Sequence, residues 1–299
     1  MGTGRHGPGV GMRSTNFELV TRSGTPLRGD LRSGEGTDPL PVVVVCHGFK
    51  GFKNWGFFPY LGEQLAAAGM LAVGFNFTGS GIGVDLETFT ELDLFAADTT
   101  TQQLDDLGTV LHALEQGEIG GGRADLRRIA VLGHSRGGAV AILGARADRR
   151  LRAVVTWAGV STLLRWPEAE ARAWRARGYT EVLNTRTGQT LRMNATYLDD
   201  LAANGERYDV TRAVSELEVP LLVVHGGADT SVPAREARAL HAAARPGRAE
   251  LLLLPDAGHT FGAEHPWRGT NPALERAILH TAAWLQATLV HVQEGSAPR

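Results

Sequence analysis

Six runs of consecutive apolar residues are spread along the chain, beginning with PVVVVCHG at 41–48. These runs show no alternation of apolar and polar positions, which is the pattern of strands buried on both faces of a parallel sheet. We therefore predict six buried strands. The other five runs lie at residues 71–77, 128–133, 152–159, 220–226 and 249–255.

Segments with apolar residues at helical spacing separate these runs. Leu104, Leu107, Leu111 and Leu114 form one such stripe. A chain that alternates strands with helices favours a mostly parallel central sheet flanked by helices, connected by right-handed crossovers. The expected fold class is therefore α/β, with a hairpin at 16–32 preceding the first buried strand. Further helices are predicted at 57–68, 136–147, 234–244 and 272–289.

Residues 161–208 interrupt the alternation, because they contain no buried strand run. Their pattern predicts a short amphipathic helix over 165–178, an exposed hairpin or extended loop over 179–194, and a second short helix over 196–205. Functional loops collect where the strands end, so we expect an inserted lid over a site. A surface excursion that only covers core is the alternative.

The domain organisation follows from these elements. We expect one domain over 16–292, with the inserted lid at about 161–208. The glycine-rich segment 1–15 predicts a flexible leader, and it lacks the apolar region of a signal peptide. Residues 293–299 predict a flexible tail.

Composition narrows the class of protein. The hydrophobic content of 43% and charged content of 21% are ordinary for a soluble globular chain. The net charge of −2 and the absence of a basic cluster argue against a nucleic-acid partner. No apolar run is long enough to cross a membrane. Cys46 is the single cysteine, so no internal disulfide requires an oxidising compartment, and we expect a cytoplasmic protein.

The candidate chemistry begins at GHSRGG, residues 133–138, where a strand run changes to a helix. A sharp strand-to-helix turn forces strained backbone angles on its middle residue and requires small neighbours. Gly133 and Gly137 leave that room, and Ser135 would stand exposed at the start of the helix. This is the pattern of a nucleophile elbow.

A serine nucleophile needs a base, and the base needs an acid that orients it. Asp229 follows the strand run at 220–226, and His259 follows the run at 249–255. Consecutive strands thus deliver an acid and a base at the same edge of the sheet, in the order expected after the serine. Asp256 lies only three positions before His259 and is poorly placed to bond its ring.

An oxyanion hole needs two backbone N–H groups that point at developing negative charge. The residue after the nucleophile, Arg136, predicts one donor. The second is predicted at Phe49, in the loop HGFKG at 47–51, where Gly48 and Gly51 let the backbone approach a substrate. We expect His47 to brace this loop.

On the motifs HGFKG, GHSRGG, HGGAD (225–229) and DAGHTF (256–261), the chain resembles the α/β-hydrolase family over roughly residues 16–290. Within it, the chain is similar to bacterial serine hydrolases of the dienelactone-hydrolase-like and feruloyl- or cinnamoyl-esterase-like group. The resemblance implies an α/β-hydrolase fold with an inserted lid. Dienelactone hydrolases use a cysteine nucleophile, so Ser135 argues against lactone hydrolysis of that type.

The expected activity is that of a serine carboxylesterase acting on small to medium esters, with Ser135, His259 and Asp229 as its triad. We expect no metal and no organic cofactor. Trp55, beside the oxyanion loop, and Trp166, in the insertion, are predicted to bind substrate. A peptidase or amidase of the same fold and a non-catalytic ligand-binding member are the alternatives. A homodimer through helices at the sheet edge is a further hypothesis.

Overall fold

One eight-stranded sheet runs through the computed structural model, which describes residues 11–294. Its strand order is β1-β2-β4-β3-β5-β6-β9-β10, with β1–β2 and β2–β4 antiparallel and every other pair parallel. All six predicted buried strands are present, as is the predicted hairpin. The strands are β1 (Met12–Val20), β2 (Pro26–Gly34), β3 (Leu40–Cys46), β4 (Leu71–Phe75), β5 (Ala124–His134), β6 (Leu151–Trp157), β9 (Leu221–Gly226) and β10 (Ala249–Leu254).

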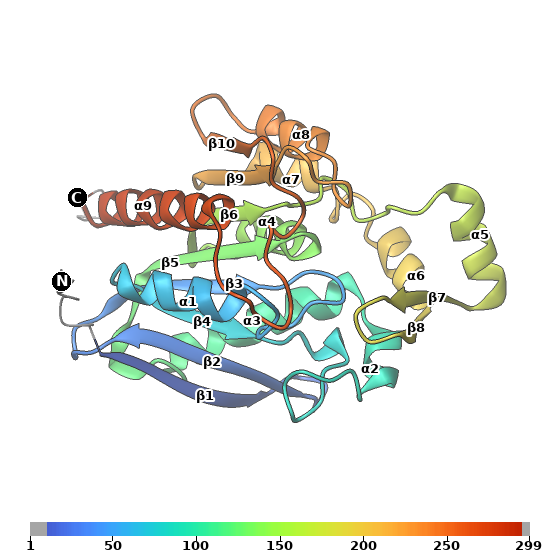
Figure 1. Cartoon of the computed structure of the whole chain (residues 1–299), viewed down its shortest axis with the longest axis horizontal. Coiled ribbons are helices and arrows are strands. Elements are labelled where there is room, and N and C mark those ends of the chain that lie inside the picture. The colour runs from blue at the N-terminus through green and yellow to red at the C-terminus, as the bar shows by residue number, and fades with distance from the viewer. Residues whose placement is uncertain (1–10, 295–299) are drawn as a thin grey trace, which may run out of the picture.

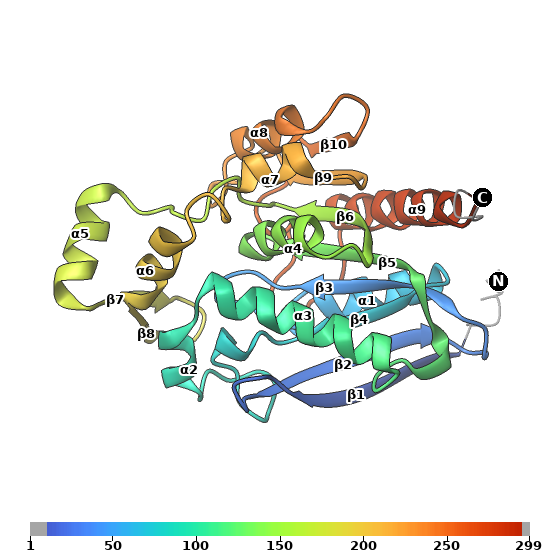
Figure 2. The same cartoon turned by 180° about the vertical axis from the view of Figure 1, so that it is seen from behind.

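Helices cover both faces of the sheet. Helices α1 (Phe58–Ala67) and α9 (Pro272–Glu294) lie on one face, toward the viewer in Figure 1. Four helices cover the opposite face, which Figure 2 shows from behind. They are α3 (Thr100–Gln116), α4 (Arg136–Ala147), α7 (Val210–Glu216) and α8 (Arg235–Ala243).

Each parallel strand contributes to two cores, because successive side chains point to opposite faces. In β3, Val42 and Val44 enter the core under α3 and α4, whereas Val43 and Val45 enter the core under α1 and α9. This explains the uninterrupted apolar runs in the sequence: a strand covered on both sides has no polar face.

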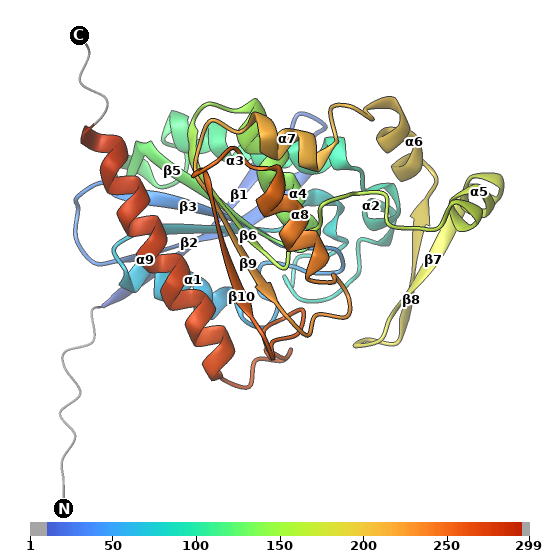
Figure 3. The ribbon, with the colours of Figure 1, turned by 90° about the horizontal axis from the view of Figure 1, so that it is seen from above.

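The insertion, residues 161–208, lies beyond the carboxyl ends of the parallel strands (Figures 1 and 3). It contains α5 (Glu168–Arg177), the hairpin β7 (Tyr179–Asn184) and β8 (Gln189–Asn194), and α6 (Thr196–Ala203), so two short helices flank a hairpin as predicted. Trp174 and Tyr197 stack in a small core of the insertion, with their ring planes 5° apart.

The boundaries of the domain differ from the prediction. Strand β1 starts at Met12, so residues 12–15 belong to the sheet and not to a leader. The cause is backbone pairing of Met12–Asn16 with Asp30–Gly34, which needs no apolar side chain on an exposed edge strand. Helix α9 extends to Glu294, which is two residues past the predicted end of the domain at 292 and five past the predicted end of the helix at 289. The rest of the predicted leader and tail, 1–10 and 295–299, lies outside the described residues.

No helix within residues 11–294 is long and apolar enough to cross a membrane.

Asp106 on α3 accepts hydrogen bonds from Thr78, in the segment that follows β4. The backbone N–H and the hydroxyl of Thr78 donate to its Oδ2 at 2.8 and 2.9 Å, and Gln102 donates to its Oδ1 at 3.0 Å. Burial raises the pKa of the Asp106 carboxyl to about 6, although these hydrogen bonds act in the opposite direction. The folded protein therefore holds this proton to a higher pH than the unfolded chain does.

We expect this carboxyl to make stability fall as the pH rises from about 4 to about 6, because the folded state binds more protons than the unfolded state over that interval. Urea unfolding across this interval should show a shallower decline for Asp106→Asn, by up to roughly 3 kcal/mol. The exposed Asp38→Asn is the control, because the neighbouring Asp105 itself raises the pKa of Asp106. An unchanged pH slope in Asp106→Asn would contradict the expectation.

Candidate active site

Ser135 stands in a strained turn between β5 and α4. Its backbone angles are φ 57° and ψ −120°, in the region that non-glycine residues rarely adopt. A Cβ on Gly133 would lie 2.0 Å from the Gly137 carbonyl oxygen, and one on Gly137 would lie 2.4 Å from the His47 oxygen. Neither glycine can therefore be replaced without moving backbone. The predicted elbow is present, and its serine is half-buried.

Asp229 and His259 meet in the loops that follow β9 and β10. His259 Nδ1 lies 2.8 Å from Asp229 Oδ2. The other carboxylate oxygen accepts the N–H groups of Ser231 and Val232, each at 2.8 Å. Burial acts to raise the pKa of Asp229, but the hydrogen bonds from His259 and Val232 outweigh it and hold this pKa below its usual value. An ionised Asp229 requires the proton of His259 on Nδ1, which leaves Nε2 free to accept one.

Ser135 and His259 line one cavity of about 540 Å³ at the carboxyl ends of the strands. His259 is partly exposed, with 23% of its side chain accessible, whereas the Asp229 side chain is fully buried. The carboxyl group of Asp229 is thus shielded from water, whereas the ring of His259 faces the cavity. The fold brings the predicted nucleophile and base to a common surface from positions far apart in the chain.

The loop after β3 runs directly beside the serine. A Cβ on Gly48 would lie 2.9 Å from the Cβ of Ser135, so only glycine permits this approach. Phe49 follows in this loop and lines the same cavity. Arg136 is the first residue of α4, and the N–H groups of a helix's first turn have no acceptor within the helix. Both predicted oxyanion donors therefore belong to backbone next to Ser135.

His47 braces this loop, as expected. Its Nδ1 donates to the carbonyl of Gly48 at 2.9 Å, and its Nε2 accepts the N–H of Phe77 at 3.1 Å. These two bonds need a neutral ring, and burial lowers the pKa of His47 to about 4.

His134 makes a contact that the sequence did not reveal. Its Nε2 donates to the backbone carbonyl of His259 at 2.9 Å, and the two rings lie 4.8 Å apart. The ring is packed against Phe57 and Phe58. Burial lowers the pKa of His134 to about 3, so the ring stays neutral and this nitrogen keeps one proton to donate. His134 therefore joins the turn that carries Ser135 to the loop that carries His259.

His134→Phe should keep an aromatic ring packed at this position and lose the hydrogen bond to the His259 carbonyl. We expect kcat/KM for ester substrates to fall roughly tenfold, the size of one buried hydrogen bond of about 1.4 kcal/mol. Steady-state kinetics of the variant measure this. The exposed His241→Phe on α8 is the control and should match the wild type. An unaltered kcat/KM in His134→Phe would show that the bond to His259 has no role in catalysis.

The two predicted substrate-binding tryptophans have different surroundings. Trp55 lines the cavity and stacks on His265, with ring centroids 6.0 Å apart. Trp166 is not among the residues that line the cavity; its ring packs edge-on against Trp174 and Tyr197. The structure therefore does not place Trp166 at this cavity: its indole packs on an apolar cluster that joins the insertion to Phe52, Phe89 and Phe95.

The insertion reaches the cavity through its hairpin instead. Residues 184–186, at the β7–β8 turn, line it, as do Lys50, Glu264 and His265. No signal in the sequence distinguishes these polar residues from ordinary solvated ones, apart from their position near the predicted site. Among residues 11–294, no group of three or more His, Cys, Asp or Glu side chains is placed to hold a metal ion.

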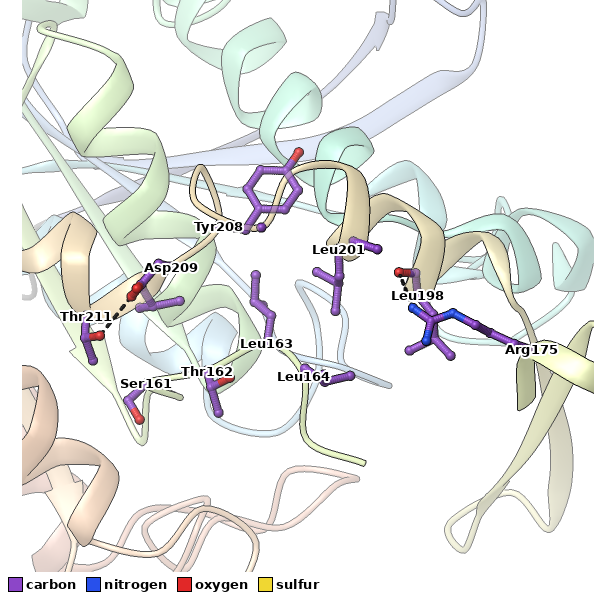
Figure 4. Close-up of a pocket in the computed structure, with 13 residues that line it drawn as sticks. Ser161, Thr162, Leu163, Leu164, Arg175, Leu198, Leu201, Tyr208, Asp209 and Thr211 are labelled. Atoms are coloured by element: carbon purple, nitrogen blue, oxygen red, sulfur yellow. Dashed lines mark hydrogen bonds between the residues drawn. The ribbon is translucent and has the colours of Figure 1, made fainter. Parts of the chain in front are cut away.

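A second cavity, of about 440 Å³, lies at the base of the insertion (Figure 4). Leucines from both of its connections line it, with Tyr208 and Asp209 on one side and Arg175 on the other. None of Ser135, Asp229 and His259 lines this cavity.

Comparisons with known proteins agree with this fold. A family model described as "Alpha/beta hydrolase family" matches residues 43–273. A "Putative carboxymethylenebutenolidase" of Escherichia coli (strain K12) is 25% identical over 252 residues, covering 80% of this chain and 76% of that protein.

Solved esterase structures share the fold. Est1E from Butyrivibrio proteoclasticus, with ferulic acid bound, superposes with a TM-score of 0.70 at 18% identity, over 92% of this chain and 99% of that one. An esterase domain from Rhodothermus marinus gives a TM-score of 0.64 at 19% identity, over 93% and 99%.

Proposed function

The chain belongs to the alpha/beta hydrolase family, and from that premise we propose that it is a serine carboxylesterase that hydrolyses small to medium carboxylic esters. One observation carries the proposal: His259, held by the buried Asp229 at 2.8 Å, lines the same cavity as Ser135 in its strained turn. A nucleophile, a base and an orienting acid are the groups that acyl transfer requires.

In the proposed mechanism, the Oγ of Ser135 attacks the ester carbonyl while Nε2 of His259 takes the hydroxyl proton. The imidazolium keeps its Nδ1–H on Asp229, whose negative charge stabilises it. The N–H groups of Phe49 and Arg136 would stabilise the tetrahedral oxyanion. Collapse of this intermediate breaks the ester bond, and His259 returns the proton to the leaving alcohol. Water, activated by His259, then hydrolyses the acyl-enzyme and frees Ser135.

The cavity supports the proposed size of substrate. Its volume of about 540 Å³ falls in the range of small-molecule sites, which is roughly 300–1,000 Å³. Phe49, Trp55 and Phe58 provide an aromatic wall, so an apolar or aromatic acyl group would bury well there. One structural relative binds ferulic acid, which makes feruloyl esters a reasonable part of the substrate panel.

The test is to measure kcat/KM for p-nitrophenyl acetate, butyrate, hexanoate and decanoate, and for methyl ferulate. We expect turnover of the shorter esters, and the chain length at which kcat/KM is greatest measures how long an acyl group the cavity accepts. Matched p-nitroanilides separate an esterase from an amidase. Folded protein that turns over none of the esters would reject the esterase, with anilide hydrolysis favouring an amidase and no turnover at all favouring a ligand-binding protein.

A further inference from the structure

The side chain of Arg136 is buried, although arginine is among the residue types least often found inside proteins. Its guanidinium carbon lies 4.2 Å from the ring centroid of Phe49 and 4.8 Å from that of Tyr197. Phe49 belongs to the loop proposed to supply the other oxyanion donor, and Tyr197 belongs to α6 of the insertion. One side chain thus contacts both the oxyanion loop and the insertion.

A third contact fixes the guanidinium. Its Nη1 lies 3.6 Å from Oδ2 of Asp98, a buried residue at the end of α2 (Leu92–Ala97). The same oxygen accepts a hydrogen bond from Gln103 at 2.7 Å. Within the described residues, Nη1 of Arg136 has no hydrogen-bond partner. The planar cation is therefore positioned by two aromatic faces and one carboxylate, an arrangement that a guanidinium suits better than an ammonium group.

The two proposed oxyanion donors differ in rigidity. The N–H of Arg136 is fixed by α4, whereas Phe49 lies in a loop between Gly48 and Gly51, where backbone freedom is greatest. The Phe49 ring adds packing contacts to the hydrogen bonds that the Gly48 carbonyl accepts from His47 and Gly51 within this loop. It contacts Phe95 at a centroid distance of 5.7 Å and the Arg136 guanidinium at 4.2 Å. In the same loop, Lys50 Nζ donates to the Leu183 carbonyl of the insertion at 3.1 Å.

We propose that Arg136 is a positioning residue whose guanidinium, clamped between Phe49 and Tyr197, sets the spacing of the two oxyanion donors and so makes catalysis depend on the insertion. The proposal rests on the esterase function proposed above. Its physical basis is that displacing one donor by about 1 Å weakens transition-state binding, and such misplacement costs up to about 100-fold in rate. Most of the cavity wall, including Trp55 and Phe58, lies outside this clamp, so substrate binding in the ground state should change less than the rate.

The first test compares two truncations on opposite sides of the clamp. Arg136→Met and Tyr197→Leu should each lower kcat about 10- to 100-fold while KM stays within about threefold. Tyr197→Phe is the matched control, because it keeps the ring over the guanidinium and removes only the hydroxyl, which donates to the Leu163 carbonyl at 3.3 Å. Arg136→Lys keeps the positive charge but lacks the planar group, so we expect its kcat to lie between those of Arg136→Met and the wild type.

The double variant shows whether the two residues act as one unit. If the clamp is the cause, Arg136→Met combined with Tyr197→Leu should be no slower than the worse single variant, because the second change removes a contact already lost. Multiplying effects would show independent damage and would overturn the proposal.

A folding defect is separated from a positioning defect in two ways. Arg136→Met leaves Asp98 buried without its cation, so Arg136→Met with Asp98→Asn removes the pair together and should show the same loss of kcat. Near-ultraviolet circular dichroism checks the native packing of each variant.

The affinity for a trifluoromethyl ketone probes the oxyanion hole directly, because its adduct with Ser135 carries an oxyanion. Its affinity should fall in parallel with kcat, while the affinity of the product acid stays constant. Unchanged kcat in folded Arg136→Met, or losses confined to KM, would overturn the proposal and leave the esterase function standing. Absence of ester turnover in the wild type would instead reject the function itself.

Discussion

Ser135→Ala is expected to lower kcat/KM for p-nitrophenyl esters by about 10⁴- to 10⁶-fold, the cost of losing the nucleophile of a serine hydrolase. The strained turn, flanked by Gly133 and Gly137, presents the hydroxyl of Ser135 at the cavity that His259 also lines. Residual turnover would come from binding and the oxyanion donors alone. Stability should change little, because an alanine fits wherever the serine Cβ fits.

The matched control for this variant is Ser231→Ala. Ser231 lies in the same loop as Asp229, its side chain is exposed, and its contact with Asp229 uses the backbone N–H, which alanine keeps. We expect its activity to stay within about twofold of wild type. A fluorophosphonate probe should label the wild type and Ser231→Ala at Ser135, and should not label Ser135→Ala. Labelling at another serine, or activity surviving in Ser135→Ala, would reject the assignment of the nucleophile.

Asp229→Asn should lower kcat by about 10³- to 10⁴-fold, the second largest effect that we expect. The amide cannot stabilise the imidazolium, and its NH₂ group favours the wrong tautomer of His259. Kinetics at neutral pH measure the effect. Asp256→Asn is the control, because Asp256 is exposed on the same turn as His259 and should be nearly silent. Comparable losses in both variants would indicate a general electrostatic effect and not an orienting carboxylate.

The same variant carries a pH signature. The folded-state pKa of Asp229 is held below its usual value, so the carboxylate stabilises the folded protein above pH about 4 and loses this contribution as the pH falls through the folded-state pKa. The difference in unfolding free energy between wild type and Asp229→Asn should therefore be full at neutral pH and shrink in acid. A difference that stayed constant down to pH about 3 would contradict this assignment.

Strand positions were predictable because burial on both faces leaves a clear sequence pattern. All six apolar runs became strands, including 41–48 and 220–226, and the candidate triad followed from what lies just past three of them. Helix α2 was not predicted, because six residues are too few to show a period. The start of β1 was missed for a related reason: an exposed edge strand needs pairing partners and no apolar residues.

The sequence by itself determined the fold class and the local machinery at each loop, because these depend on short-range requirements. Glycine is needed at both 133 and 137, because backbone atoms lie too close for a Cβ at either position. A strand covered on both faces must be apolar throughout.

The tertiary structure alone decided which side chains meet across the insertion. It packed Trp166 against Trp174 and Tyr197 and not against the cavity, joined His134 to the carbonyl of His259, and placed Arg136 between Phe49 and Tyr197. The contacts of His134 and Arg136 join residues 61 to 125 positions apart in the chain, and those of Trp166 join residues 8 and 31 positions apart. The pattern of apolar residues carries no information on such pairs, because it records burial and not the identity of the neighbour.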